Sequence, residues 1–379
     1  MKYWFIVLIV LISWDSYAQI GGNSTYEFLR IPNSARITAL GGSLITVRDG
    51  DLNLAYHNPA ALNPAMHRRV AFNQSAYMGG TTHGYLAYGH YIDQGKVPVM
   101  VHAGLQYISY GKFQNYDVAG TYMGETRASE YAINLGAGYQ ISKFLSVGAN
   151  AKTILSYLGG FNSVGMAFDF ATMFNDTAKK ISVTVAFKNM GTQFSTYNRN
   201  GNMEPLPFDL QIGVAHRLKY IPLRFSVILH NIHRWGIVYD DPNNQSNQTL
   251  FTDGQQQQDN SAIKVVDDIF RHFIFNVEFL FGKKGKPEVF RVQAGYNHQR
   301  RGELVSSGVS DIAGFSFGAG IRIKQFQIDY GFGGYHFAGA AHHFGLSVNL
   351  DEILKGAWKK DPNRKKKKKQ RQEEAEDEE

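Results

Sequence analysis

The chain has no cysteine among its 379 residues, which excludes disulfides, thiol nucleophiles and thiolate metal sites. Residues 19–379 also lack any apolar run of about 18 residues, the length that a transmembrane helix requires. Proline is scarce (10 residues), whereas glycine (39), phenylalanine (26) and tyrosine (21) are abundant. This composition does not suit an ordinary α/β enzyme. It is typical of a β-barrel, which needs aromatic girdles at two membrane interfaces and small side chains in its lumen.

Residues 1–18 have the pattern of a secretory signal peptide. Lys2 precedes an apolar stretch over 3–12, and Ser16 and Ala18 put small residues at the two cleavage positions. We therefore expect an exported protein, for which nucleic acid is not a partner.

Fourteen runs with alternating apolar and polar residues follow residue 68: 69–78, 83–92, 97–111, 128–141, 144–157, 163–174, 180–190, 207–218, 222–234, 271–281, 287–299, 312–323, 325–333 and 341–350. In the fourth run, Tyr131, Ile133 and Leu135 alternate with Glu130 and Asn134. A period of two gives each strand one apolar and one polar face, and fourteen is even, as single-chain bacterial barrels require. The sequence therefore predicts an all-β fold, a 14-stranded antiparallel transmembrane β-barrel over residues 68–350. A soluble β-sandwich or propeller is the alternative.

The links between these runs alternate in length. The long ones are 112–127, 191–206, 235–270 and 300–311, whereas the others are mostly short and several carry lysines. Because such barrels have short periplasmic turns and long outer loops, we expect both termini on the periplasmic side.

Two segments beyond the strands have their own patterns. Residues 263–270 have the apolar positions of a short helix that caps the outer end of the barrel. Residues 351–379 join a basic block to an acidic one and are predicted to be a disordered periplasmic tail. Electrostatic contact of this tail with periplasmic anions or proteins is the alternative.

The N-terminal segment 19–67 is predicted to be a plug, or hatch, in the lumen. Its motif residues are the paired glycines of a tight turn, an acidic turn and an Asn-Pro that ends any helix: Gly41, Gly42, Asp49, Asp51, Asn58, Pro59 and Ala60. The segment is too short to bury itself, and its charges Arg30, Arg36, Arg48, Asp49 and Asp51 need partners. The lumen side of the strands offers Glu130, Asp169, Asp209, Glu278, Asp329, Lys152, Lys188, Arg217, Arg224, Arg291 and Arg322.

The block from Thr25 to Asn63 resembles the N-terminal hatch of the FadL-like outer-membrane barrels. Within that group, residues 26–30 and 32–36 resemble the PorQ/PorV group of the type IX secretion system. The resemblance implies a non-enzymatic outer-membrane scaffold that anchors a surface protein, PorZ, beside PorU and PorV. That attachment complex joins secreted proteins to surface lipopolysaccharide. The fatty-acid branch of the same group implies the alternative, a transporter of hydrophobic small molecules across the outer membrane.

If the protein is a scaffold, its partner meets the outer loops. Aromatic and methionine residues in polar surroundings are typical binding anchors, and the loops offer Tyr116, Tyr122, Met123, Trp235 and Tyr239.

The sequence contains none of the common catalytic motifs, which favours a protein that is not an enzyme. The thirteen histidines form no His-x-x-x-His pattern, and there is no phosphate-binding glycine loop and no Gly-x-Ser-x-Gly. His342 and His343 point to opposite faces of a strand. Thr81, His83 and His90 lie at one rim and are interpreted as interfacial anchors. We expect no cofactor and no metal.

Overall fold

The computed structural model describes residues 24–93, 98–198, 201–237, 261–282, 288–304, 312–336 and 339–353. The predicted signal peptide, Tyr239 and the tail beyond residue 353 lie outside the described residues. Among the described helices, none is both long and apolar enough to cross a membrane.

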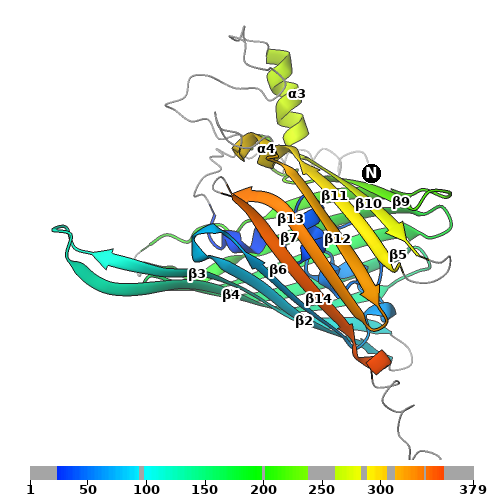
Figure 1. Ribbon diagram of the computed structural model, residues 1–379, viewed down its shortest axis with the longest axis horizontal. Helices are drawn as coiled ribbons and strands as arrows, with labels where there is room; N and C mark the ends of the chain where they lie inside the picture. The colour runs from blue at the N-terminus through cyan, green and yellow to red at the C-terminus, as the bar shows by residue number, and fades with distance from the viewer. Residues whose placement is uncertain are drawn as a thin grey trace, which may run out of the picture.

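Fourteen antiparallel strands form one closed barrel, which confirms the predicted fold class (Figure 1). The strands are β1 (Arg69–Ala76), β2 (Thr82–Ile92), β3 (Val99–Tyr116), β4 (Tyr122–Gln140), β5 (Leu145–Leu158), β6 (Phe161–Asp176), β7 (Ile181–Ser195), β8 (Asp209–Arg217), β9 (Leu223–Leu229), β10 (Phe273–Phe281), β11 (Phe290–Asn297), β12 (Phe315–Ile323), β13 (Phe326–His336) and β14 (Gly339–Asn349). The barrel closes where β1 pairs with β14, from Arg69 opposite Asn349 to Ala76 opposite His342. Because the barrel is closed, no strand exposes unpaired backbone N–H and C=O groups to lipid.

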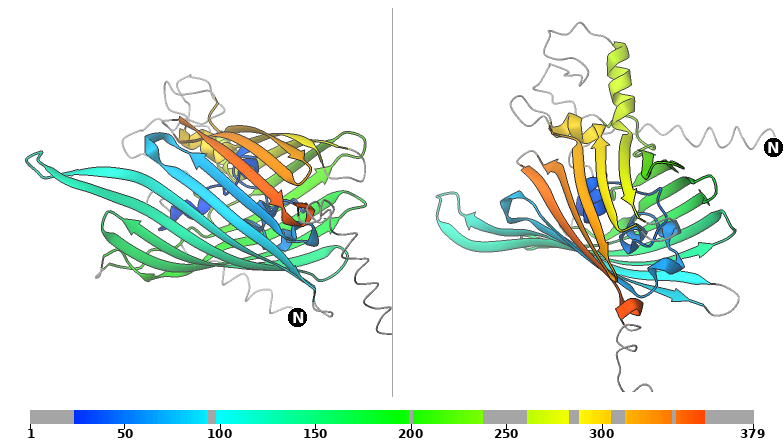
Figure 2. Two further views of the ribbon diagram at one scale, coloured as in Figure 1. Left: turned by 60° about the horizontal axis from the view of Figure 1, so that its bottom comes forward. Right: turned by 45° about the vertical axis from the view of Figure 1, so that its right-hand side comes forward.

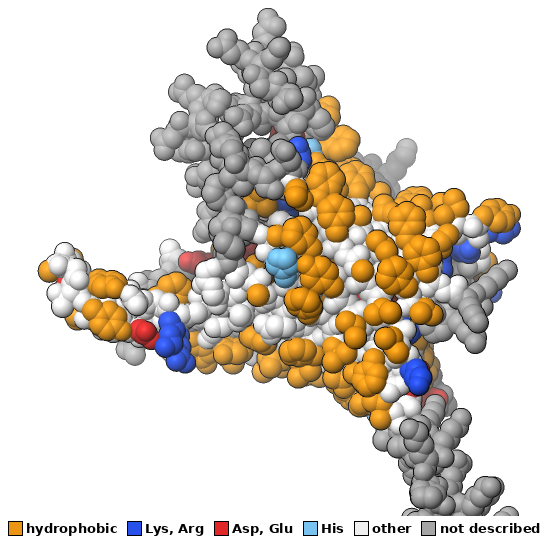
Figure 3. All heavy atoms as spheres, viewed as in Figure 1, with side chains coloured by type: hydrophobic (Ala, Val, Ile, Leu, Met, Phe, Trp, Pro, Cys, Tyr) orange, Lys and Arg blue, Asp and Glu red, His pale blue; other side chains and the backbone are white. Residues whose placement is uncertain are grey.

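The outer face of the wall is apolar. In β4, Ile133 and Leu135 are 46% and 58% exposed, whereas Ala132 and Asn134 between and beside them are fully buried. Figure 3 shows hydrophobic side chains covering the outer surface of the strands, with the charged side chains gathered near the strand ends. A closed sheet with this outer face is the arrangement that lipid requires, and the strands are therefore membrane-spanning segments.

One predicted loop is wrong: residues 112–127 are mostly strand. β3 continues to Tyr116 and β4 begins at Tyr122, so only 117–121 is a turn. β7 likewise continues to Ser195. The β3–β4 extension carries polar residues on both faces, and the inward-facing residue of the β7 extension is the buried but polar Gln193. The period-two hydrophobic pattern that identifies a strand is therefore absent there.

The two ends of the barrel differ. The end that holds links 141–144, 177–180 and 324–325 is called the short-turn end, and β1 begins there while β14 ends there. The opposite, loop end holds link 196–208 and the helices α3 (Ser261–Arg271) and α4 (His298–Leu304). Helix α3 contains the predicted helical segment 263–270 and stands out from the loop end (Figure 1).

The N-terminal residues 24–66 occupy the lumen as a chain of short helices, and this segment is called the plug. It consists of η1 (Glu27–Arg30), α2 (Ala35–Ala39), η2 (Leu52–Tyr56), η3 (Pro59–Ala61) and η4 (Pro64–Met66). In two further views it lies within the ring of strands (Figure 2). Thr25 N–H donates to the carbonyl of Pro205 at the loop end, whereas η4 packs against β2 near the short-turn end. The first described residues thus lie at the opposite end from the start of β1. The side on which the two termini lie stays a prediction.

Candidate functional site

The plug owes its shape to side chains that cap its short helices. Asp51, Asn58 and Asn63 each accept a hydrogen bond from the backbone N–H two residues later, which begins η2, η3 and η4. The Asn58 Nδ2 also donates to the carbonyl of Ile45 at 2.6 Å, so this residue joins two distant parts of the plug. The Asn-Pro pattern at residues 58–59 therefore marks a helix start inside the lumen.

Glycines of the wall allow the plug backbone to come close. A Cβ added at Gly148 in β5 would lie 2.3 Å from the carbonyl carbon of Pro59, and one at Gly295 in β11 would lie 2.2 Å from the Gly41 nitrogen. Gly41 and Gly42 have φ values of 69° and 92°, a region that favours glycine. Glycine thus allows both the tight turn of the plug and the close approach of the plug backbone to the wall.

Arg36 is the centre of a buried ion-pair cluster between plug and wall. Its guanidinium is 1% exposed; Nε donates to Glu278 of β10 at 2.9 Å, and Nη1 donates to Asp51 at 3.1 Å. Its Nη2 lies 2.9 Å from the Asp49 carboxylate. Arg36 therefore binds the acidic turn of the plug and, through Glu278, also binds the barrel wall.

Two wall arginines extend this cluster. Arg224 of β9 lies 2.5 Å from Glu278 and 3.7 Å from Asp49, and Arg291 of β11 lies 2.7 Å from Asp329 and 3.6 Å from Asp51. Burial acts to raise the pKa of Asp49, but the attraction of Arg36 and Arg224 outweighs it and holds that pKa below its ordinary value. The Asp49 carboxylate is therefore ionised at neutral pH.

A second polar cluster lies around His57. Lys188 Nζ donates to the Nδ1 of His57 at 2.8 Å, and Lys152 pairs with Asp169 at 2.7 Å. Lys152 Nζ also lies 4.4 Å from the ring centre of Tyr56, a cation–π contact. Burial lowers the pKa of His57 well below its ordinary value, and the two lysines lower it further, so the ring is neutral.

The predicted plug residues thus meet the wall in separate places. Gly41 and Gly42 contact β10, β11 and Arg300. Asp49 and Asp51 belong to the Arg36 cluster, and residues 58–60 lie against β4, β5 and β6. The eleven charged residues predicted for the lumen all lie at inward-facing positions of strands, and Glu278, Arg224 and Arg291 form ion pairs with the plug. The others pair mainly within the wall.

No family model matches the chain, and no curated protein matches it. Among solved structures it is similar to the toluene transporter TodX of Pseudomonas putida, with a TM-score of 0.48 and 12% identity over 87% of this chain and 98% of that one. It is also similar to a FadL homologue of Pseudomonas aeruginosa, with a TM-score of 0.42 and 8% identity over 83% and 98%. LpxR of Salmonella typhimurium gives 0.31 and 10% over 74% and 99%. At these identities the likeness concerns the fold alone.

The residues predicted to bind a partner lie at two places. Tyr116 and Tyr122 face each other across the β3–β4 hairpin with ring centres 5.9 Å apart, and Met123 beside them is 67% exposed. They belong to strands, not to a loop as predicted. Trp235 in link 230–272 is 66% exposed, and its ring centre lies 5.2 Å from that of His272. The prediction for Tyr239 falls outside the described residues.

The structure does not assemble the rim residues Thr81, His83 and His90 into one group. His83 is buried in the lumen, where its Nδ1 lies 3.3 Å from Ser75 Oγ, whereas His90 points outward and contacts the Tyr88 hydroxyl. Of the described residues, no three His, Asp or Glu lie close enough to hold a metal ion.

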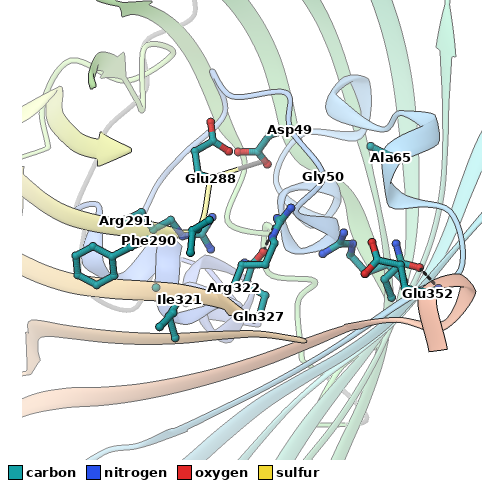
Figure 4. Close-up of a pocket in the computed structure, with 14 residues that line it drawn as sticks. Asp49, Gly50, Ala65, Glu288, Phe290, Arg291, Ile321, Arg322, Gln327 and Glu352 are labelled. Carbon is teal, nitrogen blue, oxygen red and sulfur yellow. Dashed lines mark hydrogen bonds between the residues drawn. The ribbon is translucent and has the colours of Figure 1, made fainter. Parts of the chain in front are cut away.

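The sequence search missed one feature, a cavity of about 380 Å³ between plug and wall at the short-turn end (Figure 4). Its wall side includes Arg69 and Arg322. Arginines close to strand ends at the short-turn side would have been the available signal, but the sequence does not show which of them lack an acidic partner.

Proposed function

We propose that the protein is a non-enzymatic outer-membrane scaffold of the type IX secretion machinery, which anchors a PorZ-like surface partner of the attachment complex. The resemblance of residues 26–30 and 32–36 to the PorQ/PorV group supplies the partner class. The rival role is a transporter of hydrophobic small molecules.

The observation that carries the proposal is the ribbon formed by residues 110–127. Pairing of β3 with β2 ends at Ser109 opposite Thr82, and pairing of β4 with β5 ends at Ala128 opposite Leu158. Beyond these points β3 and β4 pair only with each other, and the ribbon projects from the loop end (Figures 1 and 2).

The ribbon has the surface of a docking element. Phe113, Tyr116, Tyr122 and Met123 are each about half exposed or more, and Val118 at the tip is fully exposed. Apart from a hydrogen bond from Gly159 N–H to the Arg127 carbonyl at the base, both edges of the ribbon are unpaired. Proteins ordinarily protect such edges unless a partner strand adds to them. Exposed aromatic and methionine side chains on a projecting ribbon favour a protein partner.

The lumen supports a scaffold more than a channel. The Arg36 and His57 clusters join the plug to β7, β9, β10 and β11, so moving the plug would expose several buried charges without partners. A transporter needs a plug that rearranges. A scaffold needs only a rigid base for its ribbon.

The test replaces Tyr116, Tyr122 and Met123 with Ala in one variant and measures which surface protein is retained after outer membranes are purified. We expect the partner to be lost while heat-modifiable barrel mobility on gels is kept. The matched control is Tyr220→Ala, because Tyr220 is 88% exposed at the short-turn end. It should retain the partner.

A second arm immobilises the plug with one engineered disulfide. A Cβ added at Gly345 in β14 lies 3.6 Å from the Ala35 Cβ, within the range of a disulfide, and the chain has no other cysteine. The Asn73 amide, 2.6 Å away, must rotate. In the oxidised Ala35→Cys/Gly345→Cys variant the partner should stay bound. If oxidation abolishes uptake of a hydrophobic compound while the ribbon variant keeps all surface proteins, the rival role is correct.

A further inference from the structure

The cavity at the short-turn end is built from both plug and wall. Asp49, Gly50 and Ala65 contribute from the plug, and the wall contributes side chains from β1, β11, β12 and β13. Figure 4 shows Arg322 and Gln327 on the wall side and Asp49 and Gly50 opposite them. The volume of about 380 Å³ exceeds that of a single phosphate or carboxylate group with several waters.

Arg69 lines this cavity without a partner. The residue is only 6% exposed, its Nε is buried and makes no hydrogen bond, and its guanidinium forms no ion pair with any residue that the structure describes. Gly50 of the plug lies beside it, since a Cβ built there would be in ordinary van der Waals contact with Arg69 Nη2, at 3.7 Å. A buried arginine without an acid is costly, and natural proteins ordinarily supply a counter-charge.

Arg322 lines the same cavity and also lacks an acid. Its Nη2 donates to the neutral amide of Gln327 at 2.8 Å, and its Nε is buried without an acceptor. The nearby carboxylates are already engaged: Asp329 by Arg291, Asp49 by Arg36, and Glu288 by Arg217 at 2.9 Å.

The remaining acid near the cavity is Glu352. It is exposed after the end of β14 and forms no ion pair with a described residue. The cavity is therefore lined by two guanidinium groups that form no ion pair with a described residue, while its carboxylates are paired with other arginines or, for Glu352, exposed.

We propose that this cavity is a binding site for one oxyanion group of the phosphate class, held by Arg69 and Arg322 at the seam between plug and wall. Guanidinium groups present paired N–H donors that match phosphate oxygens, and a bound anion supplies the ion-pair partner that Arg69 and Arg322 lack. Because plug residues line the same cavity, the anion also links the plug to the wall. The group can come from free phosphate or from the headgroup of an anionic phospholipid.

The experiment measures binding of inorganic phosphate by calorimetry to the full chain, folded in a zwitterionic detergent, with chloride keeping the ionic strength constant. We expect saturable binding to the unaltered protein. Arg69→Gln and Arg322→Gln should each weaken it about tenfold or more, since each removes charge-assisted hydrogen bonds. Arg68→Gln is the matched control, because Arg68 is exposed and already paired with Asp351 at 3.0 Å; it should bind as the unaltered chain does.

Glu352→Gln removes the competing carboxylate and should tighten phosphate binding. This variant tests the proposal through an increase in affinity, should Arg69→Gln fail to fold. The two sources are separated by reconstitution in phosphatidylcholine vesicles with or without phosphatidylglycerol. Loss of phosphate binding only when phosphatidylglycerol is present identifies the headgroup as the occupant. Absence of saturable binding in both detergent and phosphatidylcholine, or binding that Arg69→Gln and Arg322→Gln leave unchanged, overturns the proposal.

Discussion

Replacing Arg36 with Met tests whether the buried ion pairs hold the plug in place. The substitution keeps an unbranched side chain of similar length but removes the charge that Asp49, Asp51 and Glu278 share. Removing one partner from a buried ion pair costs about 3–5 kcal/mol. Arg224 remains within 2.5 Å of Glu278, so we expect the lower end, about 3 kcal/mol.

The readout is the resistance of the plug to urea. The folded protein in detergent is incubated with a protease at rising urea concentration, and cleavage within residues 24–66 is followed separately from the mobility of the closed barrel. About 3 kcal/mol corresponds to an increase of more than a hundredfold in the population of released plug. The plug should therefore become protease-sensitive at a urea concentration where the barrel of the variant is still closed.

The control is Arg68→Met. Arg68 is 45% exposed and forms a surface pair with Asp351, and such pairs contribute at most about 1 kcal/mol. If Arg36→Met and Arg68→Met shift plug cleavage equally, or if Arg36→Met has no effect, the cluster does not hold the plug and the reasoning is wrong.

Three further predictions test the wall and the polar interior. Ile133→Arg on the lipid face should cost about 2–4 kcal/mol in urea unfolding from vesicles, whereas Val118→Arg at the exposed ribbon tip should cost nothing measurable. Gly148→Ala should destabilise the plug by about 1–3 kcal/mol because its Cβ would overlap the plug backbone, whereas Gly236→Ala meets nothing within 4 Å and should be neutral in the same protease assay. Because burial keeps the folded-state pKa of His57 below the unfolded value of about 6.5, its contribution to stability is present above that pH and is lost as the pH falls below it. His57→Gln should therefore make the free energy of unfolding change less steeply between pH 7 and pH 5. An unchanged dependence on pH would show that protonation of His57 does not destabilise the folded protein.

The sequence predicted the barrel well because lipid enforces a strict rule. Each membrane strand must alternate, as Ile133 and Asn134 do, and all fourteen strands were therefore visible in the pattern. The rule fails where the strands leave the membrane. Residues 110–127 carry polar side chains on both faces, and beyond Tyr110, which packs against the plug, the ribbon has no buried face that would give a hydrophobic signature.

The plug could be predicted as a segment but not in its contacts. Inward-facing charges such as Glu278 were identifiable from strand alternation, yet their pairing with Arg36, 242 residues away, depends on how the plug folds in three dimensions. For the same reason the sequence could not show that Arg69 and Arg322 lack acids. A charge is unpaired when no acid lies near it in space, and the sequence does not show which residues lie near it in the folded chain.

Closure of β1 onto β14 has a consequence for how the protein is made. The plug is synthesised first and its contacts include α2 against β11, β12, β13 and β14, which are synthesised last. A closed wall can be entered only through the two ends of the barrel, whereas an open sheet can close around a plug that already lies against it. Contacts over such sequence separations form slowly. The edge of β1 that pairs with β14 thus stays open until nearly the whole chain, to Asn349, has been synthesised.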